Sequence, residues 1–179
     1  MGHFAQLVDR YKDKAMTLAI RMLRNKEDAE EVVQDSFIRV FKSLNKFEGA
    51  AKFSTWFYRI VYNACLTKIG RRKDEFQRLN SLDGDERELE DMAGPSSHAV
   101  LESKDLFFFV RKALEEMPER YNSVLSLFYF QELSYQEICE VTRLPLGTVK
   151  AHLFRARALL QKRLAEDLQS EYSSHAQNP

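Results

Sequence analysis

Apolar residues recur every three or four positions along most of this chain, and that helical spacing is the feature that most limits its fold. Strand-like alternation of apolar and polar residues is scarce, and only 6 Gly and 4 Pro interrupt the 179 residues. An amphipathic helix must bury its apolar stripe against another element. The sequence therefore predicts an all-α protein made of packed helices.

Three helices are predicted in the N-terminal part, over residues 3–23, 26–44 and 55–73. Asn25 is placed to cap the second helix, whose buried stripe is expected to include Ser36 and Phe41. The third helix is expected to turn Trp56 and Phe57 inward. These three helices predict a small bundle over residues 1–73.

The helical spacing stops at LNSLDGDERELEDMAGPSS, an acidic stretch with two Gly and one Pro. Because it has little to bury, a flexible linker is predicted over 74–96. A second helical block is expected over 97–165, with a first helix ending near Met117 and Pro118 at the first position of the next helix. Residues 166–179 are expected to be a disordered tail.

The stretch LSYQEICEVTRLPLGTVKAHLFRARALLQKRL carries detailed start and stop signals for two helices. Ser134 and Glu137 have the spacing of a capping box. A short helix is expected over 135–142, followed by the turn RLPLG and a longer helix that begins near Thr148. The predicted fold is thus two small helical domains joined by a flexible acidic linker, with a helix-turn-helix in the C-terminal one.

The net charge is zero, but the charge is unevenly distributed along the chain. Residues 1–73 hold 15 Lys and Arg against 8 Asp and Glu, and residues 106–164 hold 9 against 6. Between them, residues 74–105 hold 3 against 10. Two basic blocks with an acidic connector indicate that the blocks bind a polyanion.

The last helix is expected to have a cationic outer face. Between residues 146 and 163 there are five Lys and Arg and no acid, whereas a solvated helix face usually mixes charges. On a helical wheel its outer side carries Lys150, Ala151, Phe154, Arg155, Ala158 and Lys162. A plain solvated surface is the alternative, but the helix-turn-helix context favours insertion into a DNA major groove.

Two other helix faces indicate partners. On the third helix, Tyr58, Arg59 and Tyr62 are expected on the outer side, flanked by Lys52, Lys68, Arg71, Arg72 and Lys73. Such rings and cations suit single-stranded nucleic acid, although packing of the rings against another helix is the more common outcome. On the second helix, acids surround Ile38, which indicates either a solvated face or a protein interface with an apolar anchor.

Several function classes find no support in the sequence. No run of about 18 apolar residues predicts a membrane span, and the N-terminus lacks the apolar core of a signal peptide, so a cytoplasmic location is expected. Cys65, Cys139 and the four His have no metal-ligand spacing, and no catalytic constellation is found. We therefore expect no metal, no cofactor, no catalytic residues and no enzymatic activity.

Together these features resemble the extracytoplasmic-function (ECF) sigma factors of bacterial RNA polymerase, in the sigma-70 superfamily. EDAEEVVQDSFIRVFKSL resembles the region 2 helix that docks on the polymerase clamp helices, and KFSTWFYRIVYNACL resembles the stretch that recognises and melts the −10 element. The segment from ALEEMPERYNSVL to the end of the helix-turn-helix resembles region 4, which reads the −35 element. Regions 2 and 4 would then occupy residues 1–73 and 97–165.

The resemblance implies roles for individual residues. Polymerase contacts would come from Asp28, Glu31, Gln34, Asp35 and Ile38. Recognition and melting at −10 would involve Phe47, Lys52, Phe53, Trp56, Tyr58, Arg59, Tyr62 and Asn63, with Asn63 reading a flipped base in a pocket formed by the loop from Phe47 to Phe53. Contacts at −35 would involve Thr148, Lys150, Ala151, Phe154, Arg155 and Arg157; of these, Arg157 is expected to brace the helix or touch phosphate.

Departures from the family pattern limit what the resemblance implies. Glu48 stands where an Arg is frequent, and Ala151 stands where a Ser is frequent, so the preferred −10 base stays open and one −35 contact is missing. The implied partners are core RNA polymerase, through its clamp helices and flap, promoter DNA, double-stranded at −35 and single-stranded at −10, and an anti-sigma factor, with no small-molecule substrate. A stand-alone helix-turn-helix regulator is the alternative.

Overall fold

The computed structural model describes residues 2–83 and 104–175, which form helices and no strand. In chain order these are α1 (Gly2–Leu23), α2 (Lys26–Ser43), the 3-10 helix η1 (Leu44–Lys46), α3 (Phe53–Asp83), α4 (Lys104–Glu116), α5 (Glu119–Tyr129), α6 (Tyr135–Thr142) and α7 (Leu146–His175). The predicted all-α class is confirmed. Within the described residues, no helix is both long and apolar enough to cross a membrane.

Helices α1, α2 and α3 form the N-terminal bundle. The side chain of Asn25 accepts a hydrogen bond from the backbone N–H of Asp28 at 2.8 Å, which is the cap expected at the start of α2. Ser36 is buried as expected and donates to the carbonyl of Val32. Phe41 is instead 61% exposed, because it lies at the end of α2 against Phe4 near the start of α1, where the bundle tapers.

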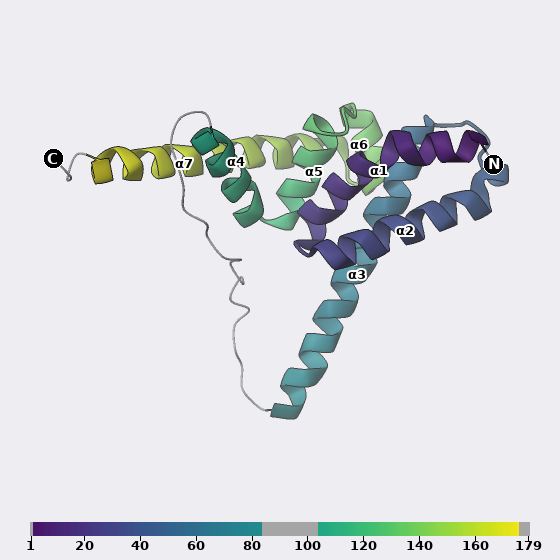
Figure 1. Ribbon diagram of the computed structural model, residues 1–179, viewed down its shortest axis with the longest axis horizontal. Coiled ribbons are helices and arrows are strands. Elements are labelled where there is room, and N and C mark those ends of the chain that lie inside the picture. Colours follow the sequence, from purple (N-terminus) through teal and green to yellow (C-terminus); the bar gives the residue numbers. More distant parts are fainter. Residues whose placement is uncertain (1, 84–103, 176–179) are drawn as a thin grey trace.

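Helix α3 is longer than the sequence predicted. It continues to Asp83, and its C-terminal half projects away from the rest of the molecule (Figure 1). The first ten residues of the expected linker, DEFQRLNSLD, are therefore helical, because they contain no Gly or Pro and several good helix formers. The rest of the expected linker, and the expected start of the second block at 97, lie outside the described residues.

Helices α4 to α7 form the C-terminal bundle, and two of its boundaries differ from expectation. Pro118 is the N-cap of α5, and its carbonyl accepts the first hydrogen bonds of the helix from Tyr121 and Asn122. Helix α7 runs to His175, so most of the expected disordered tail is helical, while residues 176–179 lie outside the described part. Ion pairs with α4 stabilise this extension: Arg163 lies 2.8 Å from Glu116, and Lys112 lies 3.7 Å from Asp167.

The two bundles pack directly against each other and share one hydrophobic core. Helix α1 lies along α5, and the first part of α3 lies along α6 (Figure 1). Polar contacts join them: the Gln131 amide donates to the Lys14 carbonyl at 3.0 Å, and Arg24 donates to the Met117 carbonyl at 2.7 Å. The face between the bundles decides which residues can reach a nucleic acid.

Candidate nucleic-acid and polymerase interfaces

The helix-turn-helix is formed by α6 and α7. The capping box predicted at its start is present, with Glu137 N–H donating to the Ser134 hydroxyl at 3.3 Å and Ser134 N–H donating to the Glu137 carboxylate at 2.8 Å. Arg143 ends α6 in the left-handed conformation, with φ of 61°. Leu144 and Pro145 then lead into α7, whose first turn includes the Leu and Gly that were expected to lie in the turn.

Helix α7 divides as its periodicity predicts. Val149, Leu153 and Ala156 are buried against the bundle. On the opposite side, Lys150, Ala151, Phe154 and Arg155 are exposed, and Phe154 exposes 74% of its surface. Thr148 is half-buried in the first turn. The predicted −35 residues therefore form one open surface near the N-terminal end of a helix, apart from Arg157.

Arg157 is held against the bundle. Its Nε donates to the Tyr129 hydroxyl at 2.9 Å, and its guanidinium lies 5.5 Å from the ring centroids of both Phe128 and Tyr129. This is the bracing contact that was expected of it. Arg155 makes a longer hydrogen bond of 3.5 Å to the Tyr121 hydroxyl, and this bond lowers the pKa of Tyr121. Arg155 is thus oriented while its surface stays exposed.

The expected single-strand face of α3 is largely covered. Tyr58 and Tyr62 are 1% and 8% exposed, so the prediction that they lie on an outer surface is wrong for this arrangement. They point outward from the N-terminal bundle, but the C-terminal bundle packs over them. Burial raises the pKa of both hydroxyls, an effect that a hydrogen bond with Ser123 of α5 partly offsets at Tyr62. Arg59 stays exposed.

The loop before α3 is organised by aromatic contacts. The Phe47 ring lies 5.0 Å from the Trp56 ring and 5.9 Å from the Phe53 ring, measured between centroids. Gly49 takes a left-handed φ of 72°, which lets the chain turn back toward the helix. Phe47, Phe53 and Trp56 therefore form one half-buried cluster at the start of α3, as their shared assignment to the −10 site would require.

Asn63 lines a cavity of about 370 Å³ with partners that the sequence analysis did not single out. Trp56 and Ile60 form its apolar wall, whereas Arg39, Ser43 and Lys46 come from the end of α2 and from η1. No residue of the Phe47–Phe53 loop lines this cavity, contrary to expectation. The i, i+4, i+7 spacing of Arg39, Ser43 and Lys46 is the signal that would have revealed the polar wall.

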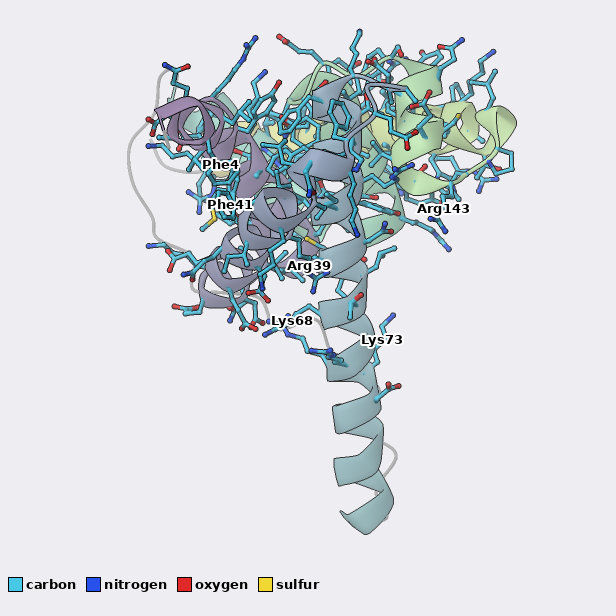
Figure 2. All side chains as sticks on the ribbon, turned by 90° about the vertical axis from the view of Figure 1, so that its right-hand side faces the viewer. Phe4, Arg39, Phe41, Lys68, Lys73 and Arg143 are labelled. Atoms are coloured by element: carbon cyan, nitrogen blue, oxygen red, sulfur yellow. The ribbon has the colours of Figure 1, made fainter. Side chains whose placement is uncertain are left out.

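Two cations expected to flank the single-strand face serve the bundle instead. Lys68 Nζ lies 3.1 Å from an Asp28 carboxylate oxygen and 2.6 Å from a Glu31 carboxylate oxygen. Arg72 pairs with Asp28 as well and donates to the Leu23 carbonyl at 3.0 Å. Figure 2 shows Lys68 on the side of α3 that faces α2 and Lys73 on the opposite side. Asp28 and Glu31 are therefore engaged inside the bundle.

The rest of the acidic face of α2 borders an apolar groove. Gln34, Asp35 and Ile38 are exposed, and Ile38 exposes 45% of its surface. A groove of about 770 Å³ runs between α1 and α2. Phe4, Val8, Met16, Gln34, Ile38 and Phe41 line it, and Phe4 and Phe41 lie side by side in Figure 2. An apolar groove with a charged rim is the form of a protein interface.

The two cysteines and the acids offer no chemistry beyond this. Burial raises the pKa of Cys65 to about 12, which keeps it a thiol at neutral pH, and Cys139 is half-buried on α6. Among the described residues, no group of three or more His, Cys, Asp or Glu is placed to hold a metal ion.

Comparisons with known proteins agree with these surfaces. The family Sigma-70 region 2 matches residues 7–75, and the family Sigma-70, region 4 matches residues 110–160. The chain is 35% identical to the ECF RNA polymerase sigma factor SigW of Bacillus subtilis, over 91% of this chain and 89% of that protein. It is 32% identical to the RNA polymerase sigma-H factor of Pseudomonas aeruginosa, over 90% and 86%.

Solved structures share the fold. The sigma factor RpoE in complex with the anti-sigma factor NepR from Bartonella quintana superposes with a TM-score of 0.71, at 23% identity, over 92% of this chain and 98% of that one. CnrH in complex with the cytosolic domain of CnrY gives a TM-score of 0.62, also at 23% identity, over 92% and 88%. From the sequence relatives and both family matches, this chain belongs to the ECF RNA polymerase sigma factors.

Proposed function

We propose a division of labour within this sigma factor in which α7 reads the −35 element, the start of α3 with its loop recognises and melts the −10 element, and α2 docks on core polymerase. Members of the family are non-enzymatic transcription initiation factors that bind core RNA polymerase and promoter DNA. The observation that carries the proposal is the exposed, acid-free outer surface of α7 within a complete helix-turn-helix.

At −35, we assign base contacts to Lys150, Phe154 and Arg155, with Ala151 allowing close approach and Thr148 near phosphate. The N-terminal part of a recognition helix reaches base edges while cations around it neutralise phosphates. Arg157 is assigned to bracing, because both its hydrogen bond and its stacking are used on α5. Residues 1–73 and 97–165 are proposed as the two functional regions.

At −10, we assign an unstacked base to the cavity beside Asn63, with Trp56 as its stacking wall. Arg39 and Lys46 on the opposite wall would neutralise the backbone of the same strand. Phe47, Phe53, Lys52, Arg59, Tyr58 and Tyr62 complete the proposed melting surface. Flipping a base costs a few kcal/mol of stacking, which such contacts must offset.

On α2, we assign polymerase contact to Gln34, Asp35 and Ile38, whereas Asp28 and Glu31 hold α2 on α3. An anti-sigma factor is a second partner for this chain, since both structural relatives described above were solved as complexes with anti-sigma proteins. The apolar groove between α1 and α2 is the surface we assign to it. Because polymerase acts on the chromosome, the proposed place of action is the cytoplasm.

The test is transcription from a promoter library by core RNA polymerase with the purified protein, followed by sequencing of the RNA 5′ ends. Specific starts with shared −35 and −10 sequences are expected. Asp35→Arg should abolish binding to core polymerase without changing the fold, and Lys12→Glu, an exposed charge reversal on α1, is its control. Tight specific binding to duplex DNA by the protein alone, with no effect of polymerase, would favour the stand-alone regulator.

A further inference from the structure

We propose that the C-terminal bundle is an internal competitor of the −10 strand: in the closed chain, α5 and α6 occupy the proposed melting surface of α3, and Glu137 takes the place of a DNA phosphate. This inference rests on the −10 assignment above and adds a regulatory step to it. The −35 surface of α7 stays open in the same closed form.

The contact at Glu137 carries the inference. One carboxylate oxygen of Glu137 lies 3.0 Å from the Lys52 ammonium and accepts a hydrogen bond of 3.4 Å from the Thr55 hydroxyl. Lys52 and Thr55 belong to the start of α3, where the −10 strand is assigned. An anionic oxygen that bridges a cation and a hydroxyl is also how a protein holds a DNA phosphate.

Glu137 is committed to this role by its other bonds. It also accepts the Ser134 N–H that closes the capping box of α6. Burial alone would raise its pKa, but the bonds from Ser134 and the charge of Lys52 lower that pKa to about 2. The carboxylate is therefore fully ionised at neutral pH and presents a constant negative charge to Lys52.

The aromatic part of the melting surface is covered by the same packing. Tyr58 and Tyr62 are buried against the C-terminal bundle, so no base can stack on them while the bundles touch. The covering contacts are polar as well as apolar, since Arg21 stacks 4.0 Å from the Phe130 ring centroid and Gln131 bonds to the Lys14 carbonyl. Contacts of this kind favour closure but are individually weak enough to be broken by a competitor.

Promoter geometry requires the bundles to separate. The −35 and −10 elements lie about 25 nucleotides apart, which is about 85 Å of duplex at 3.4 Å per step. The helix-turn-helix and the melting surface touch each other through Glu137 and Lys52, so one closed molecule cannot occupy both elements. Duplex contact at −35 is available first, and melting at −10 follows only after opening.

The test compares the full-length protein with three variants. Glu137→Gln keeps the capping box, because Gln serves at that position as well as Glu, but removes the charge from Lys52. Gln131→Ala breaks a contact of α1 with the C-terminal bundle, away from the melting surface. Glu140→Gln makes the same charge change on an exposed face of α6 and is the control. The probes are a fluorescent single-stranded −10 oligonucleotide and the radius of gyration from X-ray scattering.

Glu137→Gln and Gln131→Ala are each expected to raise affinity for the single strand about two- to five-fold, the range for one such contact, and to enlarge the radius of gyration. Glu140→Gln should change neither. An unchanged radius in both interface variants would overturn the closure. A larger radius without tighter strand binding would overturn the competition and place the −10 strand elsewhere, while specific transcription with polymerase would still stand.

Discussion

The two surfaces assigned to DNA differ in how the fold holds them. On α7, the reading face is solvent-exposed and backed by a continuous core of Val149, Leu153 and Ala156. On α3, Tyr58 and Tyr62 are themselves part of the core that joins the two bundles. A surface that reads duplex DNA needs only to be presented, whereas a surface that melts DNA must stack bases and is therefore apolar enough to be buried by the rest of the chain.

The largest expected effect is on the covered surface. Tyr58→Ala should lower the free energy of unfolding by about 3–5 kcal/mol, because it removes a buried ring and leaves a cavity. Urea denaturation measures it. Phe154→Ala is the matched truncation on the open surface, and it should change stability by no more than about 0.5 kcal/mol. Equal losses at the two positions would remove the distinction between the surfaces.

The next effect is on the open surface. Lys150→Glu should weaken binding of the polymerase complex to −35 duplex DNA about 10- to 100-fold, since it replaces a cation at the groove with an anion. Stability should be unchanged because Lys150 is exposed. The control is Lys162→Glu, the same change on the same helix about three turns later, which should have a much smaller effect. Electrophoretic mobility shifts at two salt concentrations measure both.

The sequence predicted the open surface more completely than the covered one, and the reason is physical. In α7, periodicity alone separates the buried Val149 and Leu153 from the exposed Lys150 and Phe154, because one bundle buries one stripe. In α3, the second stripe that carries Tyr58 and Tyr62 is also buried, by a bundle that begins far along the chain. A helical wheel counts the faces of a helix but does not say how many neighbours cover them.

Pairing between helices was hidden from the sequence for a similar reason. Lys68 and Arg72 look like part of a basic face of α3, and Asp28 looks like part of an acidic face of α2, until the crossing of the two helices brings them together. Local signals did succeed: Asn25, Ser134 and Glu137 form the predicted caps, because a cap depends only on residues within one turn.

A third prediction separates bracing acids from docking acids on α2. Asp28→Asn should lower the free energy of unfolding by about 1–2 kcal/mol, because it weakens ion pairs to Lys68 and Arg72 in a partly buried site. Asp35→Asn should leave stability within about 0.5 kcal/mol but weaken binding to core polymerase. Thermal unfolding and polymerase pull-down measure the two effects. The reverse pattern would assign Asp28 to polymerase and Asp35 to the fold.

The smallest expected effect is a dependence of closure on pH through Glu119. This residue begins α5 where the bundles meet, near Lys73 of α3 and Arg24 after α1, and beside Tyr62 and Cys65. Burial raises its pKa above 4.5, although the two cations partly oppose the shift. When the bundles separate, the carboxyl is hydrated and returns to its ordinary pKa, so the closed form binds a proton more readily than the open form.

Closure should therefore strengthen as pH falls from neutral toward 4.5 and weaken as pH rises again, as long as Glu119 is present. Glu119→Gln removes the buried charge, so it should favour the closed form at pH 7.5 and lose most of this pH dependence. Because Glu119 is half-buried, the change in the ratio of open to closed molecules should be below about five-fold. X-ray scattering at pH 5 and pH 7.5 measures it; His152 also titrates, but it is present in both proteins, so the difference between them isolates Glu119. A variant that is more open than the wild type at pH 7.5 would show that Glu119 holds the bundles together through Lys73 and Arg24, and would reverse the sign of its part in closure.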